Sequence, residues 1–507
     1  MIRILNALLL IALLSPTASR AQSAAPRKEF RGVWIATVDN IDWPSRKALP
    51  PDSQRAEFIR LLDAHQAAGM NAVMMQIRPA TDAFYPSPME PWSEWLTGRQ
   101  GLPPWPYYDP LAFMITETHR RGMEFHAWCN PYRATFNISK SSISPAHITR
   151  THPEWFLTYG TTRYFDPGNK LAQDYVNNVI RDMVSRYDVD AIHFDDYFYP
   201  YPIPGKEFPD AESYRRSGST LPLEDWRRSN VDSIILSLSK TIKSVKPWVR
   251  FGISPFGVWR NADKDPEGSA TKAGQTNYDN LYANILLWMK NGWIDYVVPQ
   301  LYWEFNHRAA PYEVLLDWWD KHSYGIPCYV GLGYFKAGTN AIWKDPTLLP
   351  RQVLAQRSEE NVQGAVYFSG KTFLDNPMGF SDSLARHYYR VPALVPPAAG
   401  LKTMIPDAPA FRSERLGSGS SSAQWHINIV PASEASLVKV YVISRVAAGT
   451  SGEGEIVRIV PADQATDFVL DTPQVDEGRY RYVITAVNRY NQESPGVTIG
   501  PEKIGGQ

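Results

Sequence analysis

The chain has 507 residues, enough for one large domain and a second, smaller one. Its 52 basic residues balance 52 acidic ones, so no overall positive charge favours binding to nucleic acid or to an anionic membrane. The sequence contains neither a zinc-ligand spacing nor a Gly-rich phosphate loop, and we therefore expect no cofactor and no bound metal.

The first 21 residues predict a secretory signal peptide. Arg3 supplies a positive start, residues 4–14 form a short apolar run, and residues 19–21 place small side chains at the two positions that a signal peptidase reads. The run is too short to span a membrane, and no later segment is apolar for long enough. The sequence has no Cys near the cleavage site, so we expect no lipid anchor. We expect an exported, soluble protein that is periplasmic or secreted.

From Phe30 onward, apolar strands alternate with amphipathic helices, as residues 30–37, a helix that ends at Gly69 and residues 72–79 illustrate. The eight predicted strands are 30–37, 72–79, 124–130, 191–194, 250–255, 296–303, 328–334 and 365–369. The helices predicted after the one that ends at Gly69 are 110–121, 169–187, 224–245, 278–291, 312–322, 350–361 and 382–389. Eight such repeats favour a (β/α)8 TIM barrel over residues 28–391. The alternative is an open doubly wound sheet, but no Gly-rich nucleotide turn follows the first strand.

The pattern changes after the barrel. Residues 392–409 are rich in Pro and Ala and are interpreted as a linker. Residues 410–503 contain short alternating segments that predict a small all-β sandwich. The expected strands are 424–429, 438–444, 456–460, 468–470 and 480–488. The stretch YRYVITAVNRYNQESPG from Tyr480 resembles the last strands of a fibronectin type III domain, and we assign it no chemistry.

The two cysteines, Cys129 and Cys328, fall in different predicted strands. A disulfide between them is one interpretation. Free buried thiols are the favoured one.

The stretch DAIHFDDYFYP, residues 190–200, is a predicted buried strand that ends in two carboxylates and opens into an aromatic loop. Active sites of (β/α)8 barrels lie at the carboxyl ends of the strands. Because side chains alternate along a strand, His193 and Asp195 should share one face, while Asp196 points the other way or belongs to the loop. The alternative is that both aspartates cap the next helix and solvate a loop.

Two carboxylates on different strands are what glycoside hydrolysis requires. Asp195 is the candidate nucleophile or base, with Arg78 and His193 expected nearby to keep it ionised. Glu304 is the candidate acid, because it follows Trp303 and apolar surroundings raise the pKa of a carboxyl group. Asp196 could replace either.

Further polar and aromatic residues near the strand ends are expected to bind a substrate. They are Arg78, His126, Asn130, Tyr132, Arg133, His193, Tyr197, Trp259, Arg260, Gln300, Tyr302, Trp303 and Tyr334. Buried polar groups of this kind need partners or solvent. Taken singly, His126, Gln300 and Ser254 are favoured as structural hydrogen-bonding groups.

Four segments in order resemble the signatures of glycosyl-hydrolase-like family 10. They are FRGVWIATVDNIDWPS from Phe30, AIHFDDYFYP from Ala191, GISPFGVWRN from Gly252 and PQLYWEF from Pro299. The resemblance covers residues 30–389 and implies a secreted bacterial barrel related to α-amylase-type glycosidases. It further implies a cell-wall polysaccharide as substrate, namely peptidoglycan glycan strands stripped of their stem peptides (denuded strands).

The resemblance to the amylase-type barrels has two departures. Those barrels carry an Arg two residues before the nucleophilic Asp. In this chain Asp195 stands at the nucleophile position and His193 stands where the Arg would be. They also carry the acid as a Glu on strand five, and SPFGVWRN offers none. This departure moves the acid to Glu304 or elsewhere.

Three functions therefore compete. The first is a glycosidase acting on an extracytoplasmic polysaccharide. The second is a non-catalytic glycan-binding barrel, which the missing strand-five Glu favours. The third is a metal-dependent polysaccharide deacetylase using His126, His193, Asp195 and Asp196, which lack a recognised ligand spacing.

Overall fold

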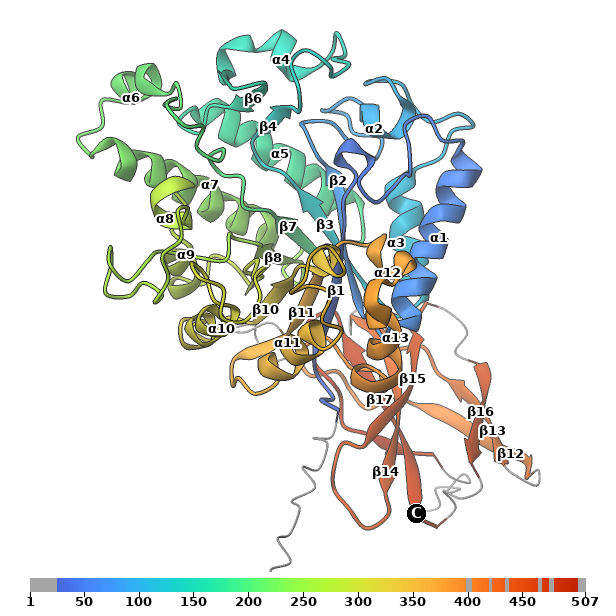
Figure 1. The fold of residues 1–507 in the computed structure, drawn as a ribbon. Coiled ribbons are helices and arrows are strands. Elements are labelled where there is room, and N and C mark those ends of the chain that lie inside the picture. The colour runs from blue at the N-terminus through green and yellow to red at the C-terminus, as the bar shows by residue number, and fades with distance from the viewer. Residues whose placement is uncertain are drawn as a thin grey trace, which may run out of the picture.

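The computed structural model describes residues 25–397, 404–418, 422–433, 437–463, 467–473 and 478–499 (Figure 1). The predicted signal peptide, residues 1–21, lies outside the described residues, as do residues 398–403 of the predicted linker. Within the described ranges, no helix combines the length and the apolar character needed to cross a membrane.

Eight parallel strands close into a barrel in the order β1-β11-β10-β9-β8-β7-β3-β2, which confirms the predicted (β/α)8 architecture. Their bounds are β1 Phe30–Ile35, β2 Ala72–Arg78, β3 Glu124–Cys129, β7 Ala191–Phe194, β8 Arg250–Ile253, β9 Tyr296–Val297, β10 Cys328–Leu332 and β11 Val362–Phe368. Closure comes from β11, which pairs with β1 in parallel from Phe30 opposite Gly364 to Trp34 opposite Phe368. Cys129 and Cys328 are both free and buried.

Helices cover the outside of the barrel (Figure 1). The main ones are α1 Pro51–Ala67, α3 Pro110–Arg120, α5 Lys170–Arg186, α7 Leu223–Val245, α10 Tyr312–Lys321 and α11 Leu348–Gln356. Their starts follow from local chemistry: Asp109 caps α3 by accepting a hydrogen bond from the Ala112 amide at 3.1 Å. Asn169 caps α5 in the same way.

Two predicted elements differ from the structure. The single helix predicted over residues 278–291 is divided into α8 Asn277–Asn280 and α9 Ile285–Lys290, because Tyr282 takes a left-handed conformation with φ of 52°. The predicted strand 296–303 ends early, since Pro299 has no amide hydrogen to donate to a neighbouring strand. Isolated bonds continue its course, such as Leu301 N to Gly331 O at 2.9 Å.

The connection from β3 to α5 carries a small antiparallel sheet that the sequence did not predict. It contains β4 Arg133–Thr135, β5 Phe156–Tyr159 and β6 Thr162–Phe165, in the order β4-β6-β5. With the short helices α2 Glu94–Thr97 and α4 Ile148–Thr151, it lies at the carboxyl end of the barrel (Figure 1).

The barrel interior is packed with side chains. Apolar and aromatic side chains such as Phe30, Trp34, Met74, Tyr296 and Tyr329 fill it. A much larger apolar cluster lies between the strands and the surrounding helices. The pocket described below therefore sits on a filled barrel.

The C-terminal region is an antiparallel sandwich. One sheet has the order β12-β13-β16 and the other β15-β14-β17-β18. The strands are β12 Phe411–Ser418, β13 Ser422–Ile429, β14 Val438–Ala447, β15 Glu455–Pro461, β16 Asp467–Pro473, β17 Tyr480–Asn488 and β18 Val497–Thr498; the sequence predicted neither β12 nor β18. Ile427 and Leu470 of one sheet share an apolar cluster with Ile443 and Ile484 of the other. The fibronectin type III resemblance stays a prediction.

The sandwich lies against the amino end of the barrel, opposite the carboxyl-end loops (Figure 1). Leu394, at the start of the predicted linker, is buried in an apolar cluster with Val440, Ile456 and Val487 of the sandwich. Its amide donates to Arg27 O at 2.8 Å, so this segment lies beside the first residues of the barrel.

Candidate active site

A pocket of about 340 Å³ opens at the carboxyl end of the barrel strands. It is lined by Trp34, Ala36, Val38, Asp39, Ile41, Gln76, Trp128, Arg133, Phe136, Asp195, Asp196, Tyr197, Ser254, Gln300, Tyr302 and Phe368. These residues come from strand ends and loops around the barrel, and aromatic rings alternate with polar groups among them. Such a concave, partly apolar surface with a few convergent polar groups is typical of a ligand site.

Asp195 is held from two sides by hydrogen bonds. Trp128 Nε1 donates to its Oδ2 at 3.1 Å, and Asn130 Nδ2 donates to its Oδ1 at 3.0 Å. Burial raises the pKa of this carboxyl group, and the charge of Arg133 and the two hydrogen bonds act against that rise. The two donors also fix the orientation of the carboxylate.

Asp196 lines the same pocket as Asp195, so of the two alternatives expected for it, a place in the loop is the one that agrees with the structure. β7 ends at Phe194, and the alternation of side chains does not continue into the loop. Burial, followed by the charge of Asp195, raises the pKa of Asp196 to about 7. The hydroxyl of Tyr201 donates to Asp196 Oδ2.

Arg133 is the single basic side chain among the residues that line the pocket, all of which the structure describes. Its guanidinium carbon lies 4.8 Å from the ring centre of Tyr197. Arg78, the residue expected to keep Asp195 ionised, is fully buried in an ion pair with Glu90, with Nη2 and Oε1 2.6 Å apart. The basic residue that lowers the pKa of Asp195 is therefore Arg133 and not Arg78, whose charge is paired with Glu90 in the loop that follows β2.

His193 and His126 lie below the pocket, inside the barrel. Both ring nitrogens of His193 have partners, Trp34 Nε1 at 3.0 Å and the Tyr296 hydroxyl at 3.1 Å. His126 contacts the same hydroxyl and the carboxylate of Glu124. The four residues of the deacetylase hypothesis therefore do not surround one point. In the part of the chain that the structure describes, no three His, Cys, Asp or Glu side chains converge as metal ligands.

Glu304 is not among the residues that line the pocket. It is half-buried beyond the end of β9, where its carbonyl oxygen accepts a hydrogen bond from Tyr312 N at 3.2 Å. Lys336 is a charged neighbour of Glu304. The structure brings Asp195 together with Asp196 and does not bring it together with Glu304.

Of the residues expected to bind a substrate, Arg133, Tyr197, Gln300 and Tyr302 line the pocket. Asn130 contacts Asp195 from behind. The remaining aromatic and basic candidates pack elsewhere. Trp259 stacks on Trp318, Arg260 pairs with Asp265 and Asp279, and Trp303 packs on Phe256. The Tyr334 hydroxyl contacts Ser381, and Tyr132 is buried within the loop between β3 and β4.

Several lining residues were missing from the predicted site. Trp34 and Trp128 point into the barrel, and the alternation along β1 and β3 could have identified them. Asp39 is an exposed carboxylate on the rim of the pocket, in a left-handed conformation with φ of 54°. Gln76 holds that loop, since its Oε1 accepts hydrogen bonds from the amides of Thr37 at 3.0 Å and Val38 at 2.9 Å.

Comparisons with known proteins extend these observations. The profile of the family described as glycosyl hydrolase-like 10 matches residues 29–345. The chain is 43% identical over 492 residues to glycosyl hydrolase YngK of Bacillus subtilis strain 168, with 94% of each chain covered. It is 41% identical over 342 residues to glycosyl hydrolase DigH of Escherichia coli strain K12, covering 64% of this chain and 76% of the relative.

Among solved structures, the chain is similar to the glycoside hydrolase domain of PgaB (BpsB) from Bordetella bronchiseptica. The TM-score is 0.44 at 14% sequence identity, and the match covers 71% of this chain and 98% of that one.

Proposed function

Because the chain belongs to the glycosyl hydrolase-like 10 family, which supports a glycosidase-type function, we propose that it hydrolyses glycosidic bonds of an extracytoplasmic polysaccharide. The observation that carries the proposal is the pair Asp195 and Asp196, buried side by side in one aromatic pocket. The proposed substrate is peptidoglycan glycan in its denuded form, in line with the resemblance of the sequence motifs and with the predicted signal peptide.

In the proposed mechanism Asp196 is the acid. Its pKa of about 7 keeps a proton available near neutral pH for the oxygen of the leaving sugar. Asp195 ionises first, because Arg133, Asn130 and Trp128 favour its charged form. Asp195 would then attack the anomeric carbon or activate a water molecule.

The walls of the pocket support a sugar ring as the ligand. Trp128, Phe136, Tyr197 and Tyr302 present aromatic surface around the carboxylates, and Arg133 and Gln300 add hydrogen-bond donors. Asp39 stands exposed at the rim, where a carboxylate can accept hydrogen bonds from sugar hydroxyls.

The experiment is incubation of purified protein with denuded glycan strands and analysis of released oligosaccharides by mass spectrometry. We expect Asp195→Asn and Asp196→Asn each to lower kcat by about 10²- to 10⁴-fold, the usual contribution of an acid or base. Asp82→Asn is the matched control: burial also raises the pKa of Asp82 to about 7, but Asp82 does not line the pocket. Its activity should stay near that of the wild type.

Glu304→Gln tests the competing acid. If it abolishes activity while Asp196→Asn does not, the assignment of the acid is wrong. If the wild-type protein binds cell-wall sacculi without releasing oligosaccharides, the non-catalytic glycan-binding function replaces the proposed one.

A further inference from the structure

A continuous row of hydrogen-bonded side chains runs along the barrel axis below the pocket. Trp34 Nε1 lies 3.0 Å from His193 Nε2, and His193 Nδ1 lies 3.1 Å from the Tyr296 hydroxyl. The same hydroxyl lies 2.9 Å from His126 Nδ1, and His126 Nε2 lies 3.0 Å from Glu124 Oε2. Trp34 lines the pocket, whereas Glu124 stands at the amino end of β3. The row therefore connects the two ends of the barrel.

The indole N–H at one end of the row and the carboxylate of Glu124 at the other set the direction of its protons. Arg250 Nη2 also lies 3.2 Å from His126 Nε2, but it donates to Glu124. An indole N–H can only donate, so His193 Nε2 accepts and His193 carries its proton on Nδ1. That proton goes to the Tyr296 oxygen, the Tyr296 hydroxyl donates to His126 Nδ1, and His126 Nε2–H donates to Glu124. Burial lowers the pKa of both histidines, which agrees with two neutral rings.

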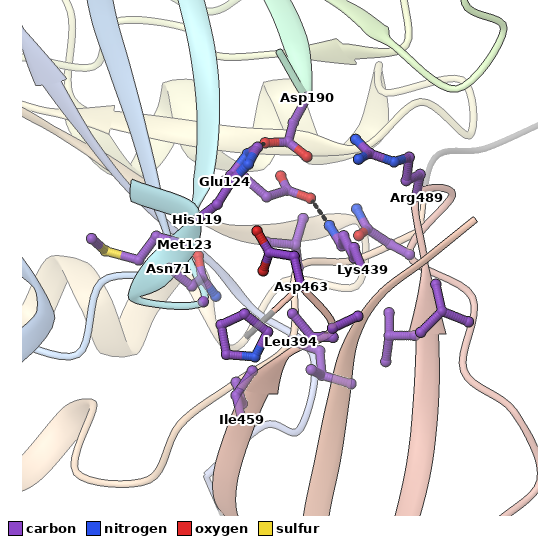
Figure 2. A pocket seen from close by; sticks show the side chains of 18 of the residues that line it. Asn71, His119, Met123, Glu124, Asp190, Leu394, Lys439, Ile459, Asp463 and Arg489 are labelled. Carbon is purple, nitrogen blue, oxygen red and sulfur yellow. Dashed lines mark hydrogen bonds and ion pairs between the residues drawn. The ribbon is translucent and has the colours of Figure 1, made fainter. Parts of the chain in front are cut away.

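The far end of the row is anchored by two cations. Arg250 of β8 donates to Glu124 Oε2 from inside the barrel. Lys439 of β14 donates to Glu124 Oε1 from the C-terminal sandwich, as Figure 2 shows. Lys439 therefore reaches across the boundary between the two regions to the last acceptor of the row.

We propose that Lys439 is a positioning residue for the pocket: by completing the anchor of Glu124, it fixes the direction of the hydrogen bonds in the row and with them the orientation of Trp34. The proposal rests on the proposed function in so far as it takes the pocket as the active site. Through Lys439, the sandwich then influences the pocket of the barrel in addition to packing against it.

The physical reason is that the row can be ordered in two ways. If Glu124 were protonated, it would donate to His126 Nε2, and each later hydrogen bond would reverse. His193 would then carry its proton on Nε2 and point it at the N–H of Trp34. Two donors cannot pair, so the fully reversed row loses Trp34. If instead the Tyr296 oxygen accepts from both histidines, its own hydroxyl hydrogen has no acceptor in the row. Only the ionised carboxylate lets every donor of the row keep a partner.

The groups that face Glu124 explain why it stays ionised. Burial would raise its pKa, but the charges of Arg250 and Lys439 hold it well below its usual range. The other titratable neighbours are Asp190, His126, Tyr296 and Tyr329. Asp190 is paired with His119 at 2.8 Å, so removal of Lys439 leaves Arg250 as the remaining cation that pairs with Glu124.

The test compares Lys439→Met with Arg489→Met across a pH series of kcat on denuded glycan strands. Arg489 is the matched control, since it also crosses the boundary, pairing with Asp188 at 2.7 Å, but it does not touch Glu124. For Lys439→Met we expect kcat to fall by about 3- to 30-fold on the acid side, with the acid limb moved to higher pH. Arg489→Met should keep the wild-type profile, and Lys439→Arg should restore it.

Equal shifts in Lys439→Met and Arg489→Met would overturn the proposal in favour of simple docking, and so would an unchanged profile in Lys439→Met. A readout independent of activity is ¹⁵N NMR of labelled histidines in the wild-type protein. It should show His193 protonated on Nδ1 and His126 protonated on Nε2 throughout the neutral range. The opposite tautomers would refute the proposal even if Lys439→Met failed to fold. Absence of any wild-type hydrolysis would refute the proposed function instead, and a comparison of the histidine tautomers in the wild type and in Lys439→Met would still decide the role of Lys439.

Discussion

At the scale of the residue, Asp195 and Asp196 are the same chemical group in one pocket but have different surroundings. Asp195 receives hydrogen bonds from Trp128 and Asn130 and lies near the charge of Arg133. Asp196 is buried beside the charge of Asp195. Environments that separate the pKa values of two neighbouring carboxyl groups are the usual way to obtain one acid and one base.

This difference predicts the pH dependence. As the pH rises through about 7, Asp196 loses its proton and can no longer protonate a leaving group. We therefore expect kcat/KM to fall on the alkaline side, with a midpoint near pH 7, measured on denuded glycan strands. In Asp196→Glu the longer side chain displaces the carboxyl group, so the alkaline midpoint of kcat/KM should move. A flat profile between pH 6 and 9 would contradict the assignment of the acid.

Arg133 provides a second prediction at this scale. Its charge lowers the pKa of Asp195, so Arg133→Met should raise that pKa, and Asp195 should become protonated at higher pH. The acid limb of the kcat profile should move upward, whereas Arg133→Lys should keep most of the wild-type position. An acid limb that does not respond to Arg133→Met would show that another group sets it.

At the scale of the element, Gly252 of β8 makes room for the centre of the axial row. A Cβ atom at this position would lie 1.9 Å from the ring of Tyr296 in the neighbouring β9. Gly252→Ala should therefore displace Tyr296 from His126 and His193. Overpacking of this kind costs about 1–3 kcal/mol, and we expect a lower Tm by calorimetry together with a lower kcat.

Gly274→Ala is the matched control for Gly252→Ala, because nothing lies within 4 Å of a Cβ atom there. Its Tm and kcat should stay at the wild-type values. If Gly252→Ala behaves in the same way, the close contact between β8 and the ring of Tyr296 is not a constraint on the barrel.

The elements also show how far sequence reasoning extends. Alternation of strands and helices predicted all eight barrel strands, because buried parallel strands are marked by local apolar runs. The small sheet β4-β6-β5 was not predicted, since β5 and β6 are only partly buried and the buried β4 has only three residues. Asp195 could be placed from the end of its strand. Arg133 was also expected at the site, but its role as the charge beside Asp195 was assigned to Arg78, because the pairing of Arg78 with Glu90 in the loop after β2 has no local signal in the sequence.

At the scale of the whole molecule, charged side chains link the sandwich and the barrel. Lys439 reaches Glu124 (Figure 2), and Arg489 pairs with Asp188. On another part of the boundary, Arg27 donates to Ser444 Oγ at 2.9 Å and pairs with Glu493. Leu394, at the start of the predicted linker, bonds to Arg27 and packs on the sandwich, so the linker begins within the contact between the barrel and the sandwich.

Arg27 predicts how this surface responds to a single change. Loss of a hydrogen-bonded charge costs about 1.5–3 kcal/mol, so in Arg27→Met we expect amide hydrogen exchange in residues 444–455 to become at least about tenfold faster. Exchange in β1 to β3 should be unchanged. Lys170→Met removes an exposed pair with Asp174 on α5 and serves as the control. Equal exchange in Arg27→Met and wild type would mean that Arg27 does not hold the sandwich.

The central claim is that the pocket hydrolyses a glycosidic bond. It is tested most directly by digesting denuded glycan strands in ¹⁸O-labelled water and measuring the mass of each product. Hydrolysis places one ¹⁸O atom at every new reducing end, and we predict this label with the wild-type protein and none with Asp195→Asn. Strands that remain intact, or products released without the label, would contradict the account.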